Sequence, residues 1–241
     1  MDKSFKDKWK FNYKDLLSKG NNLKLNKSEI ATYGLNLTPD NVTCQNAKLA
    51  GCMKTCIVDS GHAKVFKKIN QARTNRKKLF YQNTDLFMQC LIDNIENAIN
   101  KNSEKIAFRL NMFSDIQFEN VKYKGLNIYQ IFKDSNVQFY DYTKIFERFT
   151  NLEKMHLLDI CHLTFSYMPN PLFAKELNKA MKTDMNIAFI YNGNMPETFL
   201  NRKVVNGDLS DYRPLEGYNK LAIALKYKST KHDSQKSNII I

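Results

Sequence analysis

The pattern that most constrains this chain is an alternation of two kinds of segment, which begins at Ile30. Short segments rich in β-branched and aromatic residues predict strands over 30–37, 105–112, 137–142, 156–166 and 185–191, with weaker candidates at 203–205 and 221–225. Longer segments with apolar residues at helical spacing predict helices over 62–80, 85–99 and 170–182. Strands separated by helices pair in parallel through right-handed crossovers. The chain is therefore expected to adopt an α/β fold.

Two architectures satisfy this alternation: a partial TIM-like (β/α)6-type barrel with mostly parallel strands, and an open doubly wound sheet. Barrel enzymes place their active sites at the carboxyl ends of their strands, although open sheets bind ligands there too. Polar residues cluster directly after the predicted strands, at Asp115, Asp141, Lys144, Ser166, Asn192 and Asp208. We therefore expect the partial barrel, with a site at this end.

The predicted barrel domain spans residues 30–228 and includes a cysteine loop at 43–62. The segment 1–29 is rich in lysine and carries interleaved aromatic residues such as Trp9 and Phe11. We expect a basic N-terminal extension that packs on the main domain, and a disordered arm is the alternative. Residues 229–241 are mostly polar and are expected to form a flexible tail.

The chain is strongly basic. Its 37 Lys and Arg residues outnumber its 24 Asp and Glu residues, which gives a formal net charge of +13. Such a surface attracts polyanions, of which nucleic acid is the commonest in a cell. The alternative is a lysine-rich surface that serves only solubility. No apolar run has the length of a signal peptide or a membrane span, so we expect a cytoplasmic protein that does not contact membranes.

Three of the five cysteines fall in one segment, TCQNAKLAGCMKTCIVDSGH. The spacing Cys-x7-Cys-x3-Cys places Cys44, Cys52 and Cys56 on one loop, where their thiolates are suited to a soft metal. Structural zinc usually takes four ligands, with cysteines in close CxxC pairs. His62 is a candidate fourth ligand, and its alternative is a helix cap. Cys90 and Cys161, which lie within apolar patterns, are expected to be buried small side chains.

Three cysteines can hold a [4Fe–4S] cluster and leave one iron open, where S-adenosyl-L-methionine can bind and be cleaved to a radical. That chemistry suits a reducing compartment and a barrel with the cluster loop near its start. The spacing differs from the CxxxCxxC usual for such enzymes. Zinc is the alternative, and cysteines that bind no metal are a third reading.

Five segments carry a resemblance to a known family: GLNLTPDNVTCQNAKLAGCMKTC, ARTNRKKLF, RLNMFSDIQ, VQFYDYTK and VVNGDLSDYRPL. Together they span about residues 33–215, and the chain resembles the gene product 88 family of bacteriophages and plasmids. That family is similar to radical S-adenosylmethionine proteins in its cysteine loop and strand order. The resemblance implies a viral or plasmid origin, a partial barrel and an iron–sulphur centre. The chain departs from the family at Cys56-Ile57-Val58, where the family often has Cys-Tyr-Ala.

By position, the resemblance implies that Arg109, Ser114 and Asp115 form a polar turn after the second predicted strand that binds the cofactor. Asp115 is a suitable acceptor for the cofactor's ammonium group, and its alternative role is a helix N-cap.

The third-strand signature implies catalytic or substrate-binding roles for Tyr140, Tyr142 and Lys144. Lys144 can meet a carboxylate or a phosphate, or it is a solvated lysine. Asp208 matches the late signature, with binding and turn formation as its two readings. Asp211 and Arg213 are predicted to form a local ion pair.

These observations favour a radical S-adenosylmethionine-like enzyme that acts on a nucleotide, a nucleic acid or a protein and needs an electron donor. The alternative is a non-catalytic, metal-stabilised nucleic-acid-binding protein of viral replication or gene control, in which the basic helix from Lys64 to Lys78 contacts phosphate. A metal-dependent nuclease that uses Asp115, Asp141 and Asp208 is a third possibility.

Overall fold

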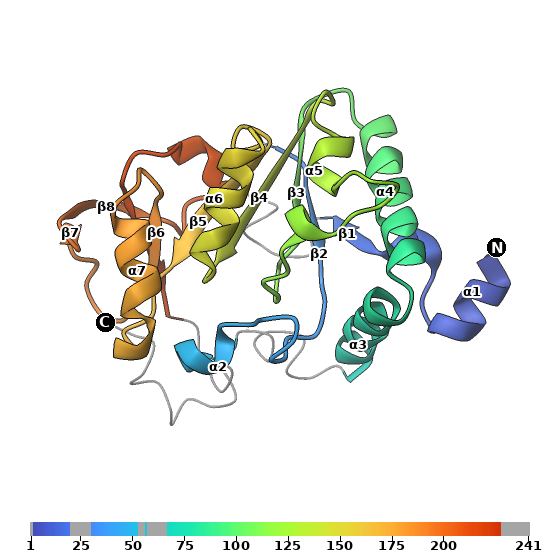
Figure 1. Cartoon of the computed structure of the whole chain (residues 1–241), viewed down its shortest axis with the longest axis horizontal. Coiled ribbons are helices and arrows are strands. Elements are labelled where there is room, and N and C mark those ends of the chain that lie inside the picture. The colour runs from blue at the N-terminus through green and yellow to red at the C-terminus, as the bar shows by residue number, and fades with distance from the viewer. Residues whose placement is uncertain (1, 20–29, 53–55, 57–66, 228–241) are drawn as a thin grey trace.

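A computed structural model describes residues 2–19, 30–52, 56 and 67–227 of the chain (Figure 1). Across these residues the strands form one nine-stranded sheet in the order β1-β2-β3-β4-β5-β6-β9-β8-β7. Neighbouring strands from β2 through β8 pair in parallel, and only the two outermost pairs are antiparallel. The strands are β1 (Leu17–Lys19), β2 (Thr32–Leu35), β3 (Ile106–Arg109), β4 (Val137–Thr143), β5 (Cys161–Ser166), β6 (Ile187–Tyr191), β7 (Thr198–Phe199), β8 (Arg202–Asn206) and β9 (Ala222–Lys226).

The predicted α/β class with mostly parallel strands is confirmed. The described sheet is open, because its order begins at β1 and ends at β7 without a pairing that joins them. Each outer parallel strand carries an antiparallel neighbour: β1 pairs with β2, and β7 pairs with β8. The edges that a closed barrel would join are therefore already paired with other strands.

Helices cover one face of this sheet (Figure 1). The α-helices are α1 (Asp2–Trp9), α2 (Ala47–Ala50), α3 (Lys67–Gln82), α4 (Thr84–Asn100), α5 (Ile128–Ile131), α6 (Phe146–Lys154) and α7 (Ala174–Met181). The 3-10 helices are η1 (Tyr13–Asp15), η6 (Phe118–Asn120), η7 (Pro171–Phe173) and η8 (Arg213–Glu216). None of the helices in the described ranges combines the length and the apolar character needed to cross a membrane.

The main core lies between these helices and the sheet. Alternate strand residues such as Phe108 and Phe139 face it, together with α4 residues at helical spacing such as Phe87 and Leu91. Trp9 of α1 is buried in the same core. The tail at 229–241 falls outside the described residues.

Helix α4 has two adjacent residues, Asn83 and Thr84, that could cap its N-terminus. The helix begins at Thr84, and the preceding Asn83 is its N-cap, because its side chain accepts a hydrogen bond from the Leu86 N–H at 3.1 Å. The Thr84 hydroxyl instead donates to the Phe80 carbonyl of α3. Either residue type suits a cap, so sequence alone does not fix which one is used.

The second face of the sheet is lined by polar and aromatic side chains and is covered by the connection between β8 and β9. His162 of β5 stacks on Tyr218 of this connection, with ring centroids 4.3 Å apart. The rings of Tyr140 of β4 and Tyr212 pack edge to face, with their centroids 5.6 Å apart. This covering segment brings residues from the end of the chain beneath the carboxyl ends of the central strands.

The burial of His162 gives the fold a dependence on pH. Burial, with a smaller effect from the positive charge of Arg213, lowers the pKa of His162 from its usual 6.5 to about 4. Between these two pKa values the unfolded chain binds a proton that the native imidazole excludes. Native stability is therefore lost as the pH falls from 6.5 towards 4. At about 1.4 kcal/mol per pKa unit, we expect about 2.5 kcal/mol of loss between pH 7.5 and pH 4.5.

The measurement compares urea unfolding of the wild-type chain with that of His162→Phe, which keeps a ring against Tyr218. The variant should lack this loss, so the free-energy difference between the two proteins should shift by about 2.5 kcal/mol in favour of the variant at pH 4.5. Burial raises the pKa of Asp141 to about 6, which acts in the opposite direction but equally in both proteins. A constant difference across this pH range would contradict the prediction.

Candidate functional site

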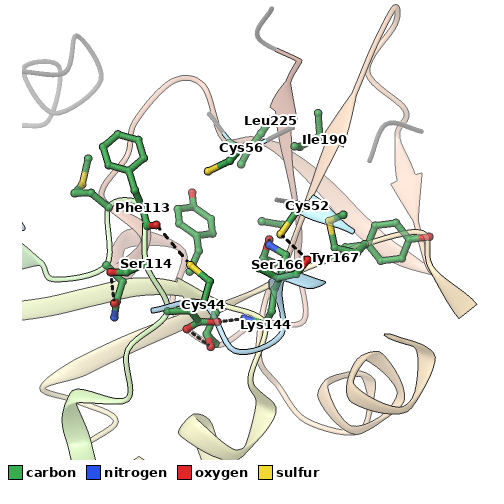
Figure 2. Close-up of a pocket in the computed structure, with 18 of the residues that line it drawn as sticks. Cys44, Cys52, Cys56, Phe113, Ser114, Lys144, Ser166, Tyr167, Ile190 and Leu225 are labelled. Carbon is green, nitrogen blue, oxygen red and sulfur yellow. Dashed lines mark hydrogen bonds between the residues drawn. The ribbon is translucent and has the colours of Figure 1, made fainter. Parts of the chain in front are cut away.

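A cavity of about 280 Å³ opens at the carboxyl ends of the parallel strands (Figure 2). The cysteine loop and α2 form one wall. The ends of β3, β4 and β5 with the residues that follow them, residues of β6 and β9, and the connection between β8 and β9 form the rest. Its polar and sulphur-bearing lining residues are Cys44, Asn46, Cys52, Cys56, Arg109, Asn111, Met112, Ser114, Asp115, Tyr142, Thr143, Lys144, Ser166, Tyr167, Met168, Asp211, Lys226 and Tyr227. This is the end of the sheet at which the sequence predicts a site.

Side-chain hydrogen bonds hold the cysteine loop in place on several elements. Asp40 accepts the Thr43 N–H at 2.8 Å and forms an ion pair with Lys77 of α3 at 2.6 Å. The Asn46 amide donates to the Lys144 carbonyl at 2.7 Å, which ties the loop to the end of β4. Asn170 donates to the Leu49 carbonyl at 2.8 Å. The loop therefore keeps a defined position over the strand ends.

All three loop cysteines face this cavity (Figure 2). The Cys44 thiol lies 3.6 Å from the Phe113 carbonyl, and the Cys52 thiol lies 3.7 Å from the Ala47 carbonyl. Burial raises the pKa of Cys44 to about 12, with smaller contributions from Asp115, Cys56 and Cys52. The Cys44 thiol is therefore neutral near pH 7 unless a positive ion stabilises its thiolate.

The three thiols surround the cavity without meeting at one point. Among the residues that the structure describes, no group of three or more His, Cys, Asp or Glu side chains stands close enough to hold a single metal ion. His62, the candidate fourth ligand, is not one of these residues. Cys90 and Cys161 are fully buried away from the cavity, as expected, and the Cys90 thiol donates to the Tyr13 carbonyl.

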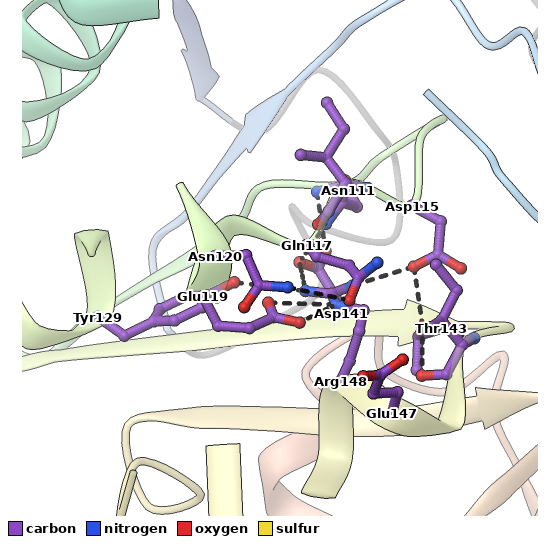
Figure 3. A network of polar contacts seen from close by, with 12 residues as sticks. Asn111, Asp115, Gln117, Glu119, Asn120, Tyr129, Asp141, Thr143, Glu147 and Arg148 are labelled. Carbon is purple, nitrogen blue, oxygen red and sulfur yellow. Dashed lines mark hydrogen bonds and ion pairs between the residues drawn. The ribbon is translucent and has the colours of Figure 1, made fainter. Parts of the chain in front are cut away.

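A buried polar network stands directly behind the cavity (Figure 3). Its centre is Arg148 of α6, whose side chain has no solvent exposure. The guanidinium contacts Asp115 at 3.0 Å, Glu119 at 3.2 Å and Asp141 at 3.9 Å. Asn111 donates to Asp141 through its backbone and its side chain, at 2.8 and 3.0 Å. One arginine thus contacts three acidic side chains, from the segment after β3, from η6 and from β4.

Asp115 is largely committed to this network. Its Oδ1 accepts the Thr143 hydroxyl at 2.8 Å as well as Arg148, and its Oδ2 accepts the Lys144 N–H at 2.7 Å. Asp115 therefore fixes the end of β4 and is not a helix N-cap. The Thr143 hydroxyl also accepts the Ile145 N–H at 3.0 Å, and Ile145 is the N-cap of α6, so Thr143 does not cap that helix.

A second ion pair forms the floor of the cavity. Arg109 of β3 contacts Asp211 at 2.9 Å, and the Tyr140 hydroxyl donates to the same carboxylate at 3.3 Å. The Arg109 guanidinium lies over the Tyr142 ring, 4.7 Å from its centroid. The predicted local ion pair between Asp211 and Arg213 is wrong: Arg213 pairs with Glu216 at 3.0 Å instead. Asp211 and Arg109 lie far apart in the sequence, so their pairing could not be predicted from it.

The structure gathers most of the candidate residues predicted from sequence. Those that line the cavity are Cys44, Cys52, Cys56, Arg109, Ser114, Asp115, Tyr142 and Lys144. Tyr140 is not a lining residue and lies beneath the floor, against Asp211. Asp208 is not a lining residue either; its carboxylate accepts the Lys226 N–H at 2.7 Å, which fits the turn reading.

Among the site residues that sequence reasoning missed are Arg148, Asn46 and Lys226. Arg148 is a single arginine within an amphipathic helix, and no local signal marks it as the centre of a network. Asn46 lies between Cys44 and Cys52, and a single asparagine there gives no local signal of its bond to the Lys144 carbonyl. Lys226 ends the last parallel strand, and the rule that polar residues at strand ends line a site could have found it.

Comparison with known proteins gives one match. The family model described as gene product 88 matches residues 9–240, which is nearly the whole chain. No curated protein and no solved structure matches.

Proposed function

The chain belongs to the gene product 88 family, and we propose that it is a radical S-adenosylmethionine-like enzyme whose [4Fe–4S] cluster is held by Cys44, Cys52 and Cys56. One observation carries this proposal: three thiols from one loop surround a cavity at the carboxyl ends of parallel strands. The strands from β2 to β6 are neighbours in chain order, which is also the order in a (β/α) barrel. That order supports the finer proposal of a partial barrel around the cavity.

The spread of the thiols favours a cluster over a single zinc ion. Zinc binds each thiolate sulphur at about 2.3 Å and gathers four ligands around one point. The described side chains do not gather in this way. A cluster of four irons is wider than one ion, so thiols that stand around a cavity suit it better. It would also supply the positive charge that the buried Cys44 thiolate needs.

A cluster with three cysteine ligands offers one open iron, and with an external one-electron reductant it supplies reductive cleavage of bound S-adenosylmethionine. The side chains of the cavity would bind that cofactor and exclude water. Ser114 donates its hydroxyl to Asn111 at 2.8 Å and keeps lone pairs for an ammonium. Asp115 uses three of its roughly four acceptor sites, so about one remains for the same group.

The other cavity residues divide into positioning and substrate groups. Arg109, paired with Asp211, closes the floor. Met112 and Met168 provide apolar walls that limit access of water. Tyr142 and Lys144 are proposed to face the substrate, which is a nucleotide, a nucleic acid or a protein. We place this activity in the cytoplasm of a cell that carries a virus or plasmid.

The second candidate function, nucleic-acid binding without catalysis, is favoured by α3. This helix contains no acidic residue, and Lys67, Lys68 and Lys78 are exposed on it. Lys77 is already paired with Asp40, and Arg76 donates to the Asp15 carbonyl at 2.8 Å. Three exposed lysines on one helix can contact phosphates but provide no sequence readout.

Anaerobic purification and reconstitution with iron and sulphide tests the enzyme proposal. We expect about four irons per chain, a broad visible absorbance, and 5′-deoxyadenosine after addition of S-adenosylmethionine and a reductant. A colourless protein with one zinc, which yields no deoxyadenosine and shifts DNA in a salt-dependent manner, would overturn it in favour of the second function.

A further inference from the structure

The charges that line the cavity do not balance. Each lining carboxylate contacts an arginine. Asp115 pairs with Arg148 at 3.0 Å, an arginine that it shares with two carboxylates behind the cavity, and Asp211 pairs with Arg109 at 2.9 Å. The lining also carries Lys144 and Lys226. Within the part of the chain that the structure describes, no carboxylate lies at ion-pair distance from either lysine. The lining therefore offers two ammonium groups, those of Lys144 and Lys226, that are not balanced by a carboxylate in contact with them.

The Lys144 backbone is held in place at both its N–H and its carbonyl. Its N–H donates to Asp115 at 2.7 Å, and its carbonyl accepts the Asn46 amide at 2.7 Å. The side chain is half-buried, and its ammonium donates to the Ser166 hydroxyl of β5 at 2.7 Å (Figure 2). A half-buried ammonium whose partner is a neutral hydroxyl retains much of its attraction for an anion.

The cationic side chains that are available in the cavity indicate which kind of anion it binds. Planar carboxylates are best matched by the two-pronged guanidinium of arginine. Arg109 already pairs with Asp211 through Nη1, and its guanidinium lies over the Tyr142 ring. An ammonium, by contrast, is a compact charge that suits the several oxygens and the larger charge of a phosphate. Lys144 and Ser166 offer an ammonium and a hydroxyl side by side, which is a phosphate-binding combination.

Aromatic side chains stand near these two residues. Tyr142, Tyr167, Phe189 and Tyr227 line the same cavity, and aromatic rings provide faces on which a nucleobase can stack. We propose that this cavity binds a nucleoside phosphate, with its phosphate on Lys144 and Ser166. The inference rests on the proposed function, because it names the substrate class of that same site, and it reduces the three substrate classes to one.

The test is direct binding of the four 2′-deoxynucleoside monophosphates to the full chain, before and after iron loading, with the matching nucleosides as controls. We expect at least one monophosphate to bind about tenfold tighter than its nucleoside. Lys144→Gln should weaken that binding about tenfold, since a hydrogen bond to a charged group is lost. Ser166→Ala should weaken it several-fold. The exposed Lys78→Gln on α3 is the matched control, with an effect below about twofold.

Unfolding curves establish that each variant is folded before its binding is compared. Equal affinity for nucleoside and monophosphate, or unchanged binding by both Lys144→Gln and Ser166→Ala, would overturn the inference. So would competition by methionine, a carboxylate ligand, without competition by inorganic phosphate. Single-stranded oligonucleotides with and without a 5′-phosphate show whether the bound group belongs to a free nucleotide or to the end of a strand. Iron content is read separately, so loss of the cluster with retained nucleotide binding would count against the proposed function alone.

Discussion

Replacing Cys44, Cys52 or Cys56 singly with serine should lower the iron bound after anaerobic reconstitution from about four atoms per chain to below about one. Among the described residues that line the cavity, the sulphur donors are these three thiols and two methionines. A cluster at this site would lose one of three anchors in each variant, and a serine hydroxyl is a poor ligand for iron in such clusters. Iron and sulphide assays, together with the visible spectrum, measure the effect.

Cys90→Ala and Cys161→Ala provide the matched controls. Both residues are fully buried in the main core and away from the cavity, so these variants should keep their iron even if they lose some stability. The prediction fails if the triple variant at positions 44, 52 and 56 binds as much iron as the wild-type chain. It fails equally if the Cys90 and Cys161 variants lose iron to the same extent as the loop variants.

The main strands were predictable because each carries a strong local pattern. β4 and β5 contain aromatic and β-branched residues. β5 lies within its predicted segment, and β4 extends one residue beyond its own. β1 and β7 were not predicted, since they have three and two residues and cannot show a periodicity. These two short strands also pair with the edges of the parallel sheet. The sequence therefore could not predict that the sheet is open, because the two strands at its edges are too short to show a strand pattern.

Site residues were predictable where they directly follow a predicted strand, or where several residues of the same type lie close together in the sequence. Cys44, Cys52 and Cys56 share a segment, and Asp115 and Lys144 follow strands, so sequence reasoning placed them at one end of the sheet. The partner of Asp211 was not predictable, because Arg109 lies 102 positions away and a nearer arginine was available. Local pairing rules favour neighbours, whereas the fold brings the β8–β9 connection beneath β3.

Arg148→Met should lower the free energy of unfolding by about 3–5 kcal/mol at pH 8. Methionine fills much of the volume of the arginine side chain, but it leaves Asp115, Glu119 and Asp141 buried without the cation that contacts all three. Urea unfolding followed by circular dichroism measures the change. Lys154→Met, an exposed position on the same helix, is the matched control and should change the free energy by less than about 0.5 kcal/mol.

The destabilisation in Arg148→Met should shrink as the pH falls, and this separates lost charge from lost packing. In the wild-type chain, burial raises the pKa of Glu119 and raises that of Asp141 to about 6, while Arg148 opposes both shifts. Without Arg148 these pKa values rise further. A carboxyl whose native pKa lies above its unfolded pKa gains stability as it is protonated, so the variant recovers stability as the pH falls through its raised pKa values. The difference between variant and wild type should therefore be largest at pH 8 and smaller at pH 5. A difference that stays constant between these pH values would mean that Arg148 stabilises the fold by packing alone, and that the three carboxylates behind the cavity do not depend on its charge.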